Sequence, residues 1–152
     1  MSLLEVLQLV GYSMAAALSF WIGASLWKRR DKLSNIERIL LALAGSMGAW
    51  HASNLAVTLH DSLGLDEGRW TTLLRLADTV AVISITLTYS FLLHVHLRLR
   101  AKSRTLTRNE SIRVYLFYIP AVFLVIAVPR LWSGPYAPMF EKLVKSFVEP
   151  ST

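Results

Sequence analysis

The stretch ILLALAGSMGAWHASNLAVTL, residues 39–59, decides the expected fold, because it runs without a charged residue for the roughly 20 positions that a membrane-spanning helix needs. Its centre, GSMGAWHASN (residues 45–54), places small residues, a Trp, a His and an Asn in an otherwise apolar run. Two interpretations fit that centre. The small and polar groups pack and hydrogen-bond against a neighbouring helix, or the segment holds a cofactor ligand or a sensing site.

Uncharged runs of similar character recur along the chain. Hydrophobic residues make up 54% of the 152 positions and charged residues only 17%. The predicted spans are residues 6–27, 39–60, 79–97 and 114–129, and the last, shorter run is completed by Ile112 and by Leu131 and Trp132. We therefore expect an all-α integral membrane protein with four transmembrane helices.

The charges outside these runs sort by loop. Residues 28–38 and 98–113 collect Lys and Arg, whereas the loop between the second and third spans is acidic. The positive-inside rule then places both basic loops in the cytoplasm and both termini outside, in a bacterial inner membrane. The formal net charge of +6 follows from this topology and from contact with anionic lipids, so nucleic acid is not expected as a partner.

A second unit is expected after the fourth span, where Pro129, Gly134, Pro135 and Pro138 should break the helix. We divide the chain into a four-helix transmembrane domain, residues 1–132, and an extracytoplasmic tail, residues 133–152. Apolar residues in the tail recur at helical spacing, which predicts an amphipathic interfacial or docking helix. They are Met139, Phe140, Leu143, Val144, Phe147 and Val148.

Small residues recur at every fourth position in the first two spans, so each row lies along one helix face. Such rows allow close backbone approach in lipid, and they predict tight pairing of spans one and two within a compact four-helix body. The rows are Gly11, Ala15, Ser19 and Gly23, and Ala44, Gly48, Ala52 and Ala56.

His51 is the one candidate cofactor ligand. His51 shares a polar stripe of the predicted helix with Asn54 and Thr58, and Trp50 is expected on the opposite side of the helix. We interpret His51 as a group that hydrogen-bonds across helices; an axial ligand to haem or a chlorophyll-type pigment, and a proton or ligand sensor, are the alternatives.

No metal site is predicted. The chain has no Cys, and two neighbouring histidines at the inner end of span three, His94 and His96, should point to nearly opposite sides. Arg75 and Asp78, three residues apart near the outer end of that span, are expected to form an ion pair. We find no nucleophile and base at a spacing that indicates catalysis, so an enzyme is not expected.

With GAWHASNLAVTL (residues 48–59) in span two and FLLHVHLRLR (residues 91–100) ending span three, the chain resembles the amino-terminal membrane sensor region of bacterial sensor histidine kinases. The likeness covers roughly residues 3–132. It implies a sensory input domain that continues into a cytoplasmic kinase. The sequence shows no phospho-acceptor helix and no ATP-binding boxes, which departs from that family's pattern.

These observations lead us to expect a non-catalytic accessory or structural subunit of a larger inner-membrane complex of respiratory or photosynthetic type. Its partners would be membrane lipids and other integral membrane subunits. The alternatives are a sensory input domain of a histidine kinase-like system and a haem- or pigment-binding protein that uses His51. No cofactor is firmly predicted, although lipid or pigment contacts fit the composition.

Overall fold

The computed structural model of the chain describes residues 2–101, 105–133 and 136–138, and the regular secondary structure of these residues is helical. Four long helices follow one another: α1 (Leu3–Trp27), α2 (Asn35–Ser62), α3 (Glu67–Arg100) and α4 (Arg108–Leu131). A short 3₁₀ helix, η1 (Arg30–Lys32), lies between α1 and α2. The all-α expectation is therefore confirmed.

Each long helix begins at a polar side chain that caps it. In α2 the Ser34 hydroxyl accepts from the Glu37 amide at 3.3 Å, and the Glu37 carboxylate accepts from the Ser34 amide at 2.8 Å. The same reciprocal arrangement starts α1 at Ser2 and α4 at Thr107, while Asp66 caps α3. These caps satisfy backbone donors that the first helical turn leaves unpaired. The helices accordingly begin several residues before the uncharged runs.

α3 is much longer than its predicted span of residues 79–97. Its 34 residues rise to about 51 Å at 1.5 Å each, well beyond the roughly 30 Å of a hydrocarbon core. Arg75 and Asp78 lie within this continuous helix. The prediction ended the element where charges appear, but charged residues do not interrupt helical hydrogen bonding.

α4 passes through two prolines, Pro120 and Pro129, before it ends at Leu131. The expectation that Pro129 breaks the helix was wrong. A proline removes one backbone donor, and the last turn still closes because the Trp132 amide donates to the Val128 carbonyl at 2.9 Å. Apolar helices tolerate such an interruption when neighbouring groups satisfy the freed backbone.

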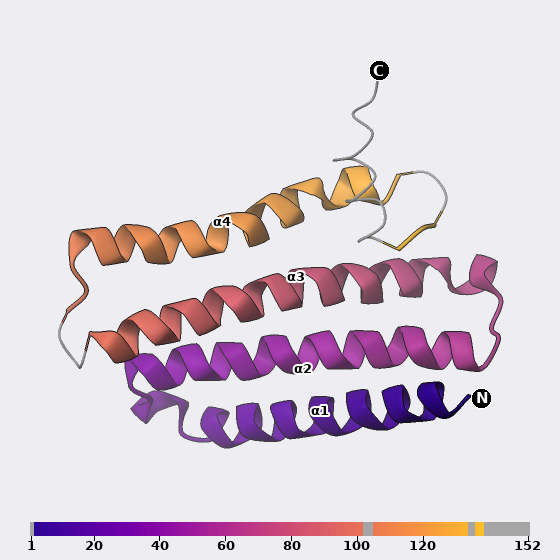
Figure 1. The fold of residues 1–152 in the computed structure, drawn as a ribbon, viewed down its shortest axis with the longest axis horizontal. Helices are drawn as coiled ribbons and strands as arrows, with labels where there is room; N and C mark the ends of the chain where they lie inside the picture. Colours follow the sequence, from indigo (N-terminus) through magenta and orange to yellow (C-terminus); the bar gives the residue numbers. More distant parts are fainter. Residues whose placement is uncertain (1, 102–104, 134–135, 139–152) are drawn as a thin grey trace.

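The four helices lie side by side in chain order as a single layer (Figure 1). The substantial contacts join α1 to α2, α2 to α3 and α3 to α4, and the last pair packs least extensively. The expected compact four-helix body is therefore wrong: α1 and α4 form opposite edges of an open row. The small-residue rows of α1 and α2 pack against each other only, so they do not bring α1 and α4 together to close the layer into a bundle.

Small and polar side chains, together with several leucines, occupy the inside of this layer, and most large apolar side chains of α1 and α4 are exposed. Buried hydroxyls include Ser46, Ser84 and Thr88, while α1 and α4 expose most of their Leu, Ile, Val and aromatic residues. Three helices of the described chain are long and apolar enough to cross a membrane, namely Leu3–Trp27, Glu67–Arg100 and Arg108–Arg130. α2, which contains the quoted stretch, is not among them.

Candidate functional site

The α1–α2 seam is tight at Gly48. A Cβ atom added there would lie 2.7 Å from Cε1 of Phe20 on α1, so any larger residue at this position requires the ring to shift. One turn away, Gly23 lies 3.9 Å from the Ala44 side chain when given a Cβ. The two rows therefore meet across this part of the seam.

The rest of the small-residue set is placed less uniformly. Ser19 is buried, Ala15, Ala52 and Ala56 are half-buried, and Gly11 is exposed, with open space where a side chain would begin. The close approach is thus concentrated between Ser19 and Gly23 on one helix and Ala44 and Gly48 on the other.

The α2–α3 seam has a row of buried, mostly small residues that was not predicted. Leu74, Ala77, Ala81, Ser84 and Thr88 are all buried and recur at spacings of three and four. The Thr88 hydroxyl lies 3.0 Å from the Ser46 hydroxyl of α2 and donates to the Ser84 carbonyl at 2.8 Å. This regular spacing could have been read from the sequence, because it marks one face of a helix.

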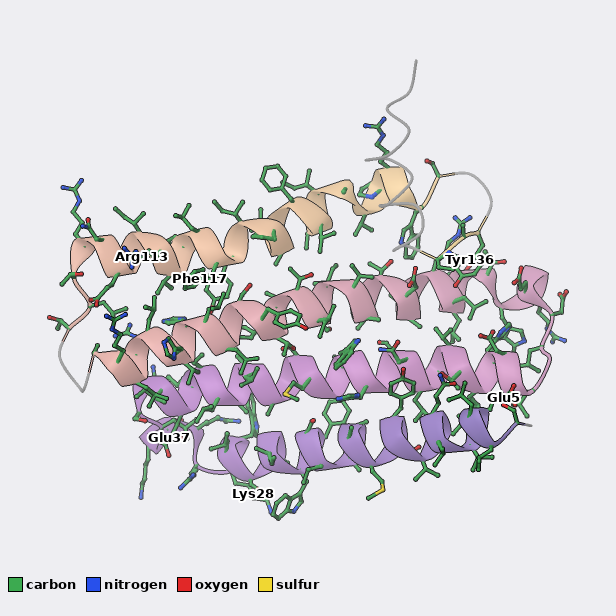
Figure 2. All side chains as sticks on the ribbon, in the orientation of Figure 1. Glu5, Lys28, Glu37, Arg113, Phe117 and Tyr136 are labelled. Atoms are coloured by element: carbon green, nitrogen blue, oxygen red, sulfur yellow. The ribbon has the colours of Figure 1, made fainter. Side chains whose placement is uncertain are left out.

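The α3–α4 seam is held by isolated polar contacts. The Ser90 hydroxyl donates to the Phe117 carbonyl at 2.6 Å, and Phe117 points from α4 towards α3 (Figure 2). Nδ1 of His94 lies 3.0 Å from the Tyr118 hydroxyl, whereas His96 is exposed. His94 and His96 thus have different surroundings and do not converge on one ligand.

His51 lies among aromatic rings. Its ring centroid is 4.5 Å from the Trp50 ring and 6.1 Å from the Tyr12 ring of α1. The expectation that Trp50 points away from His51 was wrong, because the indole folds back onto its neighbour. Nδ1 of His51 is buried without a hydrogen-bond partner among the described residues, so the expected bond across helices is not formed through this atom.

His60 lies further along α2, nine positions from His51. Its side chain is buried, and Nδ1 lies 3.2 Å from the Asp61 carboxylate. A separation of nine residues is about 13 Å along a helix axis, too far for both histidines to bind one haem iron. Among the described residues, no group of three His, Cys, Asp or Glu side chains is placed to hold a metal ion.

Arg75 anchors the end of α4 to α3. Its guanidinium donates to the Trp132 carbonyl, and the Trp132 indole donates to the Thr79 hydroxyl at 2.8 Å. The Arg75–Asp78 ion pair stays a prediction. The structure adds a role for Arg75 that spacing could not reveal, because Trp132 is 57 residues away in sequence.

Tyr136, which follows α4 in the chain, lies beside α3 (Figure 2). Burial raises the pKa of its phenol, and the nearby carboxylates of Asp78, Asp61 and Glu67 raise that pKa further. The phenol is therefore neutral at physiological pH. The predicted docking helix, from Met139 to Val148, lies outside the described residues.

The charges sort to the two ends of the layer as well as by loop. Lys28 and Arg113, from the two basic loops, lie towards one end, and Glu5 lies towards the other (Figure 2).

A comparison with protein-family models, curated proteins and solved structures found no match. Function must therefore be inferred from the chain's own residues.

Proposed function

We propose that all four helices cross the membrane, with the two basic loops in the cytoplasm. Three helices qualify by length and composition, and α2 lies between two of them. Two of its polar side chains have partners inside the layer: the Ser46 hydroxyl contacts that of Thr88, and the Asn54 amide donates to the Trp50 carbonyl at 2.8 Å. Hydrogen bonds of this kind lower the cost of placing polar side chains in lipid, so they support a span of lower apolarity.

Reporter fusions test this topology. Fusions at Leu33 and Thr105 should both behave as cytoplasmic, and a fusion at Gly64 should report from the opposite side. If the fusion at Gly64 reports from the same side as that at Leu33, α2 does not span.

We further propose that the protein is a non-catalytic accessory subunit that docks against other chains within the membrane. The observation that carries this proposal is the uncovered outer edge of the layer along α4. Tyr115, Phe123 and Ile126 are 75%, 67% and 70% exposed there. Aromatic residues supply large contact area at small cost in side-chain entropy, which suits an interface between helices. Bulky apolar side chains also face lipid, so the proposal needs a direct test.

The test is gentle detergent extraction, followed by native electrophoresis and mass spectrometry. We expect the protein to co-migrate with other integral membrane chains. The double variant Tyr115→Ala with Phe123→Ala should weaken that association, whereas Leu7→Ala with Val10→Ala on the opposite edge should not. An intact protein that runs alone contradicts the subunit proposal.

Sensory input is the second candidate function, and the loose attachment of α4 favours it. α4 is joined to α3 by a few polar contacts and packs less than the inner helices, so it is the element best able to shift in response to a signal. Co-purification with a kinase or a response component would support this function over the first.

A haem or pigment ligand is a third candidate. It is favoured by the buried Nδ1 of His51, which has no hydrogen-bond partner in the described chain. The absorption spectrum of the purified protein tests it, because a bound haem or pigment should be lost in the variant His51→Ala. A colourless intact protein excludes this candidate.

A further inference from the structure

An apolar groove lies between α1 and α2 at the end where α1 meets the first basic loop. Its volume is about 510 Å³, within the range of roughly 300–1,000 Å³ that is typical of ligand sites. Trp21 and Ile22 of α1 and Leu40 and Met47 of α2 contribute to an almost wholly apolar lining. Arg29 is the one charged residue that lines it.

The groove has the length of one membrane leaflet. Its lining runs from Leu18 to Arg29, which is about 16 Å along a helix axis, and half of a hydrocarbon core of roughly 30 Å is about 15 Å. α1 ends at Trp27, so Arg29 lies where the helix leaves the hydrocarbon. The apolar lining thus falls at acyl-chain depth and the guanidinium at headgroup depth.

Arg29 is positioned to bind an anion at that depth. Its Nη2 lies 3.4 Å from the Glu37 carboxylate, which itself is fixed by Ser34, and the Arg29 side chain remains 62% exposed. A guanidinium has five N–H donors, so donors remain for a phosphate after this contact.

The surroundings of Arg29 are also basic. Residues 28–38 carry five Lys or Arg and two acidic residues, a net charge of +3. The Arg30 guanidinium stacks over the Trp27 ring, with its carbon 4.8 Å from the ring centroid. An anionic headgroup is therefore electrostatically complementary to the mouth of the groove.

Two other grooves on the molecule provide a contrast. Both lie along α4, with volumes of about 420 and 270 Å³, and their linings include Tyr118, Val122 and Ile126. Neither lining contains a Lys or Arg. The combination of an apolar channel and a cation at its mouth is found in the α1–α2 groove and in neither of these two.

We propose that the α1–α2 groove binds one anionic phospholipid, with an acyl chain between α1 and α2 and the phosphate held by Arg29. This inference rests on the proposed insertion of the helices in a membrane. The reporter fusions test insertion separately, so a correctly inserted protein that shows no lipid preference overturns the lipid site alone.

Native mass spectrometry of the full chain tests the site. The detergent-purified protein is incubated with phosphatidylglycerol or with phosphatidylcholine of the same acyl chains. We expect the wild-type protein to retain the anionic lipid about fivefold better, the preference that one cation near a membrane surface supplies. Arg29→Gln should abolish this preference. Arg113→Gln, a basic residue towards the same end of the layer, should keep it.

A second variant tests the apolar part of the groove. Ile22 is exposed, so Ile22→Trp should fill the groove without disturbing the α1–α2 seam, and it should reduce retention of both lipids. Circular dichroism verifies that the variants remain helical. Equal retention of the two lipids by the wild-type protein, or equal losses in Arg29→Gln and Arg113→Gln, would overturn the proposal.

Discussion

α2 and α4 differ in both composition and surroundings. α2 lies between two neighbours and buries Ser46, Gly48 and Ser53, whereas α4 lies at the edge of the layer and exposes Tyr115 and Phe123. α4 is the most apolar of the candidate spans, and α2 is not a candidate. Between α2 and α4, lower apolarity accompanies contact with protein on both sides and higher apolarity accompanies exposure. The trend does not extend to the other two helices, because the inner helix α3 has a mean hydropathy of 1.7 and the edge helix α1 one of 1.5. Hydropathy alone therefore does not identify the helices that lie between two others.

The largest effect is expected from a substitution on the inner helix. Gly48→Leu places a side chain where even a Cβ would meet the Phe20 ring at 2.7 Å, and overpacking of this kind typically costs about 1–3 kcal/mol. We expect that loss in the free energy of unfolding, measured by denaturant titration in detergent.

The matched control lies three positions earlier on the same helix. Gly45 is exposed, and a Cβ there meets nothing within 4 Å, so Gly45→Leu should leave the free energy of unfolding almost unchanged. If both variants are tolerated equally, α2 is not closely packed against α1 at Gly48, and close packing does not distinguish α2 from the edge helix α4.

A smaller effect is expected at the edge helix. Trp132→Phe removes the indole donor to Thr79 but keeps an aromatic ring, and one hydrogen bond contributes about 0.5–1.5 kcal/mol. Hydrogen exchange should become faster in the last turns of α4, while α1 and α2 keep their protection. A uniform loss of protection across all four helices would show that the edge is not an independent part of the layer.

The smallest effect is expected at the exposed start of α2. The backbone hydrogen bond from Ser34 lowers the pKa of the Glu37 carboxyl, with smaller contributions from the Ser34 hydroxyl and Arg29. A lowered pKa in the folded state means that this contribution to helix stability is present above the ordinary value of 4.5 and is lost as the pH falls through the folded value.

Backbone chemical shifts of residues 34–38 measure this loss. On acidification from about pH 5 to about pH 3 they should move towards coil values in the wild-type protein. Glu37→Gln should show no such transition, and residues 45–54 should not move in either protein. Acid-induced changes in residues 45–54 would show that the cap controls more than the first turn.

Composition and periodicity sufficed for part of the fold. Uncharged runs located four helices, and the recurrence of small residues at every fourth position indicated that Gly48 approaches α1. The helix starts were also readable, because Ser2, Ser34 and Thr107 each precede a Glu by three positions. The uncharged runs missed them because a capping box contains the very charge that ends such a run.

The remaining features depend on contacts between distant positions. Trp132 meets Arg75 and Thr79 across more than 50 residues, and the fold-back of Trp50 onto His51 depends on side-chain rotamers. The open, single-layer arrangement of the helices could not be predicted from the small-residue rows. Such a row on one helix face predicts that another helix packs there, but it does not say which one. The groove at Arg29 could not be predicted either, because it forms only where α1 and α2 lie against each other.

The chain-order arrangement of the layer has a consequence for how the protein is made. Each helix packs mainly against the one synthesised just before it, so the native contacts close short loops and the contact order is low. A nascent chain can therefore complete the α1–α2 pair before α3 has left the ribosome, and α3 can join before α4 exists. Assembly needs no rearrangement of earlier helices, and of the four described helices α4 is the last added and the first that can detach.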